Sequence, residues 1–173
     1  MLTFRLIKNE ILEVFLDTQQ VLDDCLNLQQ GFNSVLLSTV NQQSEPLASY
    51  APYVAYKGGF FVFVSELALH TQNMLTTKRA SLMFIENEEQ AKNPYARQRA
   101  VIQAQVYLVE DEVLINTLFS IMEQRHGGTI NLLKTLSDFK MLELRPKHGR
   151  YIVGFGKAYQ WDLQANTMSH IAP

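Results

Sequence analysis

Residues 97–110, RQRAVIQAQVYLVE, decide the fold. Along most of this stretch apolar side chains alternate with mostly polar ones. Ile102 and Val106 would point to one face, whereas Gln103 and Gln105 would point to the other. A period of two residues is that of a β-strand, because successive side chains of an extended chain point to opposite faces. A run of this length predicts a long barrel strand.

A second stretch, VLLSTV at residues 35–40, has the β-branched and apolar composition of another strand. The polar residues 41–46 predict the turn of a hairpin whose second arm covers residues 47–56. Pro52 lies within that second arm. Since proline has no N–H to donate to a ladder, its position predicts an edge, a bulge or an interruption of the strand.

The segment FFVFV, residues 60–64, is apolar at every position. A strand with one exposed face would alternate with polar residues, so this one is expected to be buried on both sides or to lie at an interface. We therefore expect a second subunit to cover one face of the barrel, which makes the protein a homodimer.

Short helices are expected between the strands. The expected helices cover residues 16–30, 66–77, 112–126 with Asp111 as N-cap, and 129–136. Further strands are expected at 80–85, 139–144 and 151–156, with a loop at 87–94, a turn at 145–149 and a tail at 162–173. The order has no βαβ alternation. It therefore predicts an antiparallel β-barrel of the α+β class.

Length and composition suit one domain over residues 1–173, because 47% of the side chains are hydrophobic. The net charge is −2 and the 15 Lys and Arg residues are scattered, which argues against nucleic acid as a partner. No apolar run is long enough for membrane insertion, and Cys25, the single cysteine, excludes an internal disulfide. Residues 1–8 do not resemble a signal peptide, so we expect a cytoplasmic protein.

Six short segments together resemble a known family. They are SYAPY (49–53), SELALHTQN (65–73), SLMFIE (81–86), ARQR (96–99), LSDF (136–139) and GFGKAY (154–159). In this order they resemble the HugZ/HutZ haem-utilisation family, within the pyridoxamine 5'-phosphate oxidase-like, FMN-binding split barrels. The resemblance covers most of the chain after Ser34 and implies a split barrel that binds a flat cofactor.

The resemblance implies a homodimer that holds haem near the subunit interface and degrades it oxidatively with release of iron. His170 matches the axial ligand of the haem iron, and Asp138 matches an aspartate that is hydrogen-bonded to that histidine. A carboxylate on the second ring nitrogen raises the basicity of an imidazole ligand. Without the resemblance, His170 would be assigned to a solvated tail and Asp138 to a cap between two elements.

Anion contacts are expected from Arg97 and Arg99, whose two-residue spacing places both side chains on one strand face, suited to haem propionates or a phosphate. An ion pair with the acidic loop before them is an equally good interpretation. His70, Thr71 and Asn73 lie where related split barrels have a basic phosphate-binding stretch. None of these three is permanently charged, which weakens the case for FMN.

Three functions remain open. The first is a haem-degrading oxygenase-type oxidoreductase, which would need an electron donor. The second is an FMN-dependent oxidoreductase of the pyridoxamine 5'-phosphate oxidase-like group. The third is a haem storage or carrier protein without catalysis. Hydrolase, zinc and dinucleotide motifs are missing from the sequence.

Overall fold

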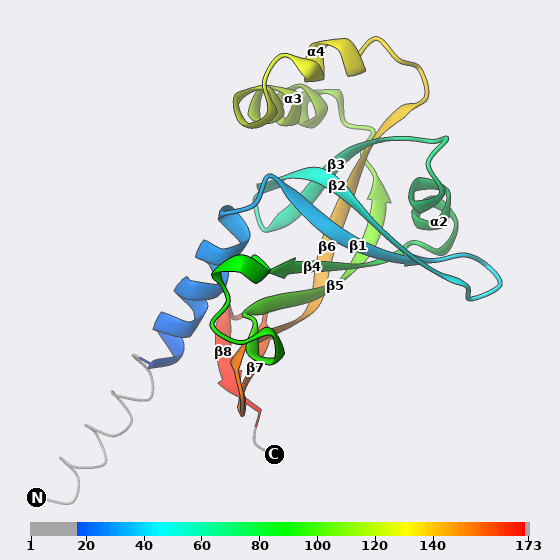
Figure 1. The fold of residues 1–173 in the computed structure, drawn as a ribbon. Coiled ribbons are helices and arrows are strands. Elements are labelled where there is room, and N and C mark those ends of the chain that lie inside the picture. Colours follow the sequence, from blue (N-terminus) through cyan, green and yellow to red (C-terminus); the bar gives the residue numbers. More distant parts are fainter. Residues whose placement is uncertain (1–16, 172–173) are drawn as a thin grey trace, which may run out of the picture. The chain divides into compact units, whose positions relative to one another are not determined.

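The structure, a computed structural model, describes residues 17–171, and six antiparallel strands in it close into a barrel (Figure 1). The barrel order is β3-β2-β1-β4-β5-β6, and β6 pairs with β3 to close it. These strands are β1 (Ser34–Val40), β2 (Pro46–Tyr56), β3 (Gly59–Ser65), β4 (Arg79–Ile85), β5 (Arg99–Leu108) and β6 (Phe139–Gly154). Beyond β6 the sheet continues into β7 (Lys157–Asp162) and β8 (Thr167–His170). The predicted antiparallel barrel of the α+β class is confirmed.

The alternation in residues 97–110 forms β5, where Ala100, Ile102, Ala104 and Val106 are buried. The strand begins only at Arg99, because Arg97 follows a short 3-10 helix, η2 (Pro94–Ala96). The prediction that both arginines lie on one strand is therefore wrong for Arg97.

Pro52 lies at the residue where β2 changes partners. It makes the last pair with β1, opposite Ser34, and the pairing of β2 with β3 starts at Tyr53. The missing N–H therefore falls where the β1 ladder ends and the β3 ladder begins, and β2 itself continues through Pro52 without a break.

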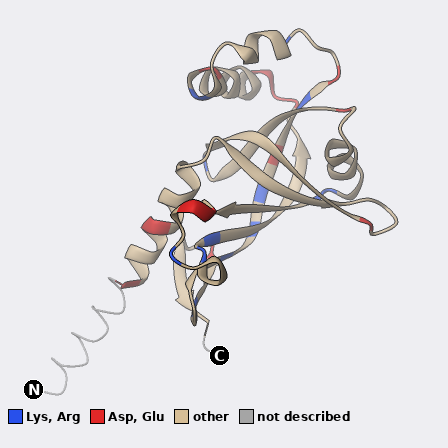
Figure 2. Cartoon of the chain, in the orientation of Figure 1, with Lys and Arg blue, Asp and Glu red and all other residues tan. Residues whose placement is uncertain are grey.

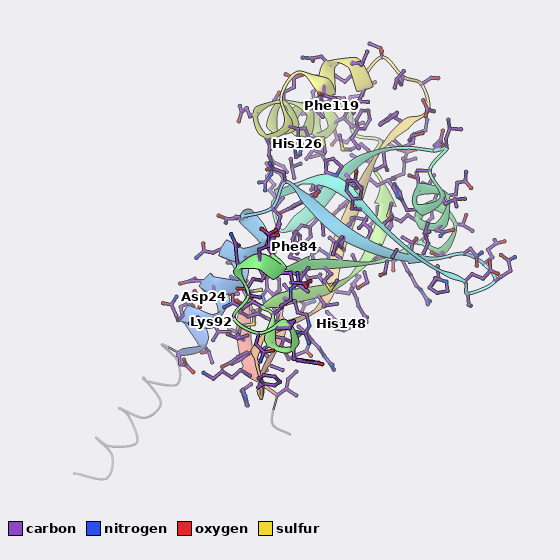
Figure 3. The ribbon with its side chains drawn as sticks, in the orientation of Figure 1. Asp24, Phe84, Lys92, Phe119, His126 and His148 are labelled. Carbon is purple, nitrogen blue, oxygen red and sulfur yellow. The ribbon has the colours of Figure 1, made fainter. Side chains whose placement is uncertain are left out.

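Both faces of β3 are covered by the chain itself. On the inner face, the ring of Phe60 lies 5.7 Å from that of Phe84 in β4. On the outer face, the ring centroid of Phe63 lies 5.0 Å from that of Phe119 in helix α3 (Glu112–His126). Figure 3 labels Phe119 on this helix. The apolar character of β3 is thus explained within one protomer. It is not an argument for a second subunit.

Helix α3 and the short helix α4 (Thr129–Leu133) form the layer that covers this face (Figure 1). Asp111 caps α3 as predicted, since its carboxylate accepts hydrogen bonds from the backbone N–H groups of Val113 and Leu114. Leu118 and Met122 of α3 pack into a cluster with Phe61. The third helix, α2 (Leu69–Thr77), packs on β1 instead.

The expected turn at residues 145–149 is wrong, because β6 runs without a break over 16 residues. Its pairing with β3 ends at Leu144, and its pairing with β7 begins at Gly149. Pro146 lies between these two ladders. A proline at a change of partner does not force a turn, although in the sequence it is indistinguishable from a turn residue.

By its contacts the described chain divides into two compact units. One holds residues 32–84 and 101–147, which include most of the barrel and helices α2, α3 and α4. The other holds residues 17–31, 85–100 and 148–171, namely a helix over residues 17–30, the 3-10 helices, the end of β6, β7 and β8. Its core includes Cys25, Tyr151 and Trp161. No described helix is long and apolar enough to cross a membrane.

Candidate functional site

His170 is the last residue of β8 and lies opposite Tyr159 of β7. Its ring packs edge-on against the ring of Tyr159, with centroids 5.3 Å apart. Its Nε2 lies 3.0 Å from the carbonyl oxygen of Gly156, and the next residue, Ile171, donates its backbone N–H to the carbonyl of Ala158. The histidine is exposed, but it belongs to a strand and not to a frayed tail.

The contact with Gly156 decides which ring nitrogen is available for other bonds. A carbonyl oxygen only accepts hydrogen bonds, so Nε2 carries the hydrogen in this arrangement and Nδ1 keeps its lone pair. An exposed imidazole with one nitrogen held by a carbonyl suits a metal ligand. No cluster of three His, Cys, Asp or Glu side chains suited to a metal ion occurs among residues 17–171. An axial ligand of haem is a single side chain and needs no such cluster.

Asp138 is half-buried just before β6 and is tied to the end of β3 in two ways. The Ser65 hydroxyl donates a hydrogen bond to its Oδ2, and the backbone N–H of Glu66 donates to its carbonyl oxygen at 2.7 Å. The hydroxyl oxygen of Ser65 in turn accepts from the backbone N–H of Leu67 at 3.1 Å. The carboxylate is therefore fixed at one oxygen by a residue 73 positions away.

Three exposed leucines lie near Ser65 or Asp138 in the sequence. Leu67 is 80% exposed and Leu69 63% exposed, two and four residues after Ser65. Leu136, two residues before Asp138, is 42% exposed. Large apolar side chains on the surface beside a held polar group are a feature of ligand sites. The three leucines are apolar surface that a ligand with apolar faces would cover.

The other residues of the SELALHTQN segment face different surroundings. His70 is half-buried at the start of α2, and burial lowers the pKa of its imidazole, so it is neutral at pH 7. Thr71 is fully buried, and Asn73 donates from Nδ2 to Oγ1 of Thr39 at 3.1 Å. Thr71 and Asn73 thus serve the packing of α2 on the barrel. A cofactor contact from any of the three stays a prediction.

The acidic loop before Arg97 binds its side chain, as the ion-pair interpretation predicts. Its guanidinium donates from Nε to the carbonyl of Glu86 at 2.9 Å and pairs with the Glu88 carboxylate at 3.3 Å. Figure 2 shows the acidic η1 helix (Glu88–Gln90) in red. Arg99 donates one hydrogen bond, from Nη1 to the carbonyl of Arg97. Of the two arginines, Arg99 keeps more donors for an anion.

The sequence missed Ser65 as a site residue. No sequence pattern marks Ser65 for such a role, because serine is common at the end of a strand. Its partner, Asp138, is also distant in the chain. His170 and Asp138 belong to different compact units, and within the described chain their hydrogen-bond partners are Gly156 and Ser65. The bond between them stays a prediction.

A pocket of about 430 Å³ lies elsewhere on the barrel unit, between the β2–β3 turn and the start of α3. Phe61 and Leu114 line it, and Arg145 is held there by a two-point hydrogen bond to Glu143. None of the predicted site residues lines this pocket.

Two sequence comparisons identify relatives of this chain. Residues 22–153 match the pyridoxamine 5'-phosphate oxidase family. The chain is 38% identical over 133 residues to "Heme oxygenase HutZ" of Vibrio cholerae, covering 76% of each protein.

Two solved structures are similar to this chain in both fold and sequence. The chain is similar to Campylobacter jejuni ChuZ with a TM-score of 0.80 and 28% identity, over 89% of this chain and 63% of that one. It is similar to the structure of Vibrio cholerae HutZ, described there as a haem storage protein, with a TM-score of 0.70 and 33% identity, over 76% of this chain and 93% of that one. The chain therefore spans less than two thirds of the ChuZ chain.

Proposed function

The chain belongs to the pyridoxamine 5'-phosphate oxidase family, with haem-utilisation proteins among its relatives, and from this premise we propose that it binds haem and degrades it oxidatively to release iron. The observation that supports this most is His170, an exposed imidazole held on β8 by the Gly156 carbonyl. The relative HutZ is named a haem oxygenase in one description and a haem storage protein in another.

In this proposal His170 ligates the haem iron through one ring nitrogen, and on haem binding the other ring nitrogen gives up the Gly156 carbonyl and donates its hydrogen to Asp138. A carboxylate in that position fixes the ring orientation and strengthens the imidazole as a donor to iron. When bound, haem supplies an iron that activates dioxygen or peroxide once an electron donor has reduced it. In this proposal the residues of this chain hold the ligand and orient the imidazole.

The apolar faces of the porphyrin would lie against exposed leucines such as Leu67 and Leu136, which would otherwise face water. Arg99 is the better propionate contact, because Arg97 is already paired with Glu88. A propionate would have to displace that carboxylate to reach Arg97.

We also propose a homodimer, whose subunit contact would be formed by residues of β1, β2 and β4 and not by β3. Leu36 of β1 and Tyr50 of β2 form a cross-strand pair, and they are 43% and 66% exposed. Met83 of β4 lies beside Leu36 in the same row. An apolar row on an outer barrel face suits a subunit contact. Light scattering after size-exclusion chromatography would give the molar mass of the protein in solution. The mass of a monomer at every concentration would contradict the proposed homodimer.

The first test is a titration of the cofactor-free protein with haem and, separately, with FMN, followed by absorbance. The proposal predicts a sharp Soret band with haem and an unchanged flavin spectrum with FMN. Tight FMN binding without a Soret shift would instead support the flavin-dependent oxidoreductase.

Degradation and storage are then separated by adding ascorbate in air to the haem complex. A degrading enzyme loses its Soret band and releases iron that ferrozine detects. A storage protein keeps its Soret band under the same conditions, and that result would contradict the catalytic part of the proposal only.

A further inference from the structure

The pocket of about 430 Å³ at the start of α3 lies within one compact unit and is not part of the proposed haem site. Neither His170 nor Asp138 lines it. Phe61 of β3, which is buried, and Leu114 of α3 give it an apolar lining. Its volume falls in the range of about 300–1,000 Å³ that small-molecule sites occupy. The pocket therefore has the size and the apolar surface to take the body of a small ligand.

Arg145 lines this pocket with a guanidinium that is held in place and keeps free donors. Its Nε and Nη2 donate to the two carboxylate oxygens of Glu143 at 2.9 and 2.8 Å. Its guanidinium carbon lies 4.2 Å from the centroid of the Tyr107 ring. Among residues 17–171, no acceptor is bound to Nη1. A guanidinium fixed in this way can donate from Nη1 to a ligand with little further loss of rotamer freedom.

Lys57 brings a second cation to the pocket, from the turn between β2 and β3. Lys57 and Gly58 form this two-residue turn, and both have a positive φ, +47° and +80°. Such a turn favours asparagine or glycine, so a lysine in it carries a conformational cost. Its ammonium lies 5.2 Å from the ring centroid of Tyr56, and no carboxylate of the described chain forms an ion pair with it. The charge of Lys57 is therefore available to a ligand.

The two acidic side chains of the pocket already have donors. Both oxygens of Glu143 bind Arg145, and Oδ1 of Asp111 accepts two backbone N–H groups as the cap of α3. The charged side chains are thus left mainly with donors, on Lys57 and on Nη1 of Arg145, against one oxygen of Asp111. A ligand that complements this pocket brings acceptors and a negative charge.

We propose that this pocket binds a small carboxylate with an apolar body, such as an aromatic acid, whose carboxylate contacts Lys57 and Arg145 and whose ring lies against Phe61 and Leu114. This inference goes beyond the proposed function and does not depend on haem. A few polar groups that fix one end of a ligand, beside an apolar lining for the rest, are the usual composition of a small-molecule site.

The test uses two fluorescent dyes with the same aromatic body. Anilinonaphthalene sulfonate carries an anion that stands in for the carboxylate, and phenylnaphthylamine lacks it. Each dye is titrated into the full chain and followed by its fluorescence, which rises in an apolar site. Phenylacetate and phenylacetamide, which differ in charge, then compete for the bound sulfonate dye.

Four variants locate the dye. Lys57→Asn removes the free ammonium and keeps a residue that tolerates a positive φ. Its matched control is Lys78→Asn, since Lys78 also has a positive φ, +58°, and belongs to the same compact unit, but does not line the pocket. Val113→Asp adds a negative charge in the first turn of α3, where aspartate favours the helix. Asn116→Asp is its control, on the same helix but outside the pocket lining. Circular dichroism of each variant checks that it is folded.

We expect Lys57→Asn and Val113→Asp each to weaken binding of the sulfonate dye about fivefold, the effect of one partly exposed charge pair, and to affect the uncharged dye less. Lys78→Asn and Asn116→Asp should bind both dyes as the parent does. Phenylacetate should displace the sulfonate dye at a lower concentration than phenylacetamide.

Equal binding of the sulfonate dye by Lys57→Asn and Lys78→Asn would overturn the proposed site. Equal losses for the two dyes would also overturn it, because the anion would then play no part, and so would a parent that does not bind the sulfonate dye. His170→Ala separates this inference from the proposed function, since it should bind the dye as the parent does. A loss of dye binding in His170→Ala but not in Lys57→Asn would place the dye at the haem site and contradict the pocket.

Discussion

Nε2 of His170 lies 3.0 Å from the carbonyl oxygen of Gly156, so the histidine at the end of β8 is held by the turn that joins β6 to β7. Gly156 has a φ of +66°, a left-handed conformation that glycine adopts without strain. The imidazole reaches this carbonyl because β7 pairs antiparallel with both β6 and β8, and the β6–β7 register shifts between Ile152 and Gly154, just before the turn. The position of the candidate ligand therefore depends on the packing of this three-stranded segment.

Gly149 tests that dependence. It lies opposite Trp161, and a Cβ at this position would lie 2.9 Å from Cε3 and 3.1 Å from Cβ of the tryptophan. Gly149→Ala should lower the free energy of unfolding by about 1–3 kcal/mol, as overpacking does, and weaken haem binding. Denaturant unfolding and a haem titration measure the two effects.

Gly154→Ala is the matched control, because a Cβ there has no atom within 4 Å apart from those of its two chain neighbours. Its stability should stay within about 0.5 kcal/mol of the parent. Equal stability of the two variants would contradict the packing of Gly149 on Trp161.

The layer formed by α3 and α4 gives a second prediction. Leu118 is fully buried in the cluster that covers the outer face of β3. Leu118→Ala should therefore cost about 2–5 kcal/mol of stability in guanidinium unfolding, from lost transfer energy and a residual cavity. Leu132→Ala, at a site 66% exposed on α4, should change it by less than about 0.5 kcal/mol. Similar losses in both would mean that α3 does not cover β3.

Cys25 gives a third prediction, on reactivity. The thiol is fully buried, and burial raises its pKa from 9.0 to about 12, although a hydrogen bond from Gln29 acts in the opposite direction. The thiolate is the reactive form, so at pH 8 the native protein should react with Ellman's reagent at least about a hundredfold more slowly than the urea-unfolded chain. Rapid labelling of the native protein would contradict the burial of Cys25.

The same shift sets a pH dependence with a defined sign. Because the folded state holds the thiol proton more tightly than the unfolded state, the contribution of Cys25 to stability is complete below pH 9. It is lost as the pH rises from 9 toward 12. Cys25→Ala should remove this part of the alkaline decline in the unfolding free energy and leave the rest. An identical decline in both proteins would show that Cys25 does not titrate in this way.

Much of the fold follows from local patterns in the sequence. The alternation of β5 and the cap at Asp111 depend on neighbouring residues, and the structure has both. The patterns failed where a partner strand decides the outcome. Pro146 was expected in a turn, but it lies between two ladders of β6 that no local pattern reveals.

The apolar run of β3 shows the same limit for packing. Burial on both faces was predicted correctly from the composition of residues 60–64, but the sequence does not say what covers each face. Phe119 of α3 does so, more than fifty positions along the chain. The candidate site is harder still, because Ser65 and Asp138 meet only through the β3–β6 closure of the barrel.

The most direct measurement of the central claim is a haem titration of His170→Ala beside His148→Ala, followed at the Soret band. His148 is a suitable control, because it is exposed, as His170 is, and lies in the same compact unit. The account predicts that His170→Ala loses or shifts the Soret band of the complex and weakens haem binding about 10–100-fold or more, whereas His148→Ala binds as the parent does. An unchanged Soret band and affinity in His170→Ala would contradict the assignment of His170 as the axial ligand.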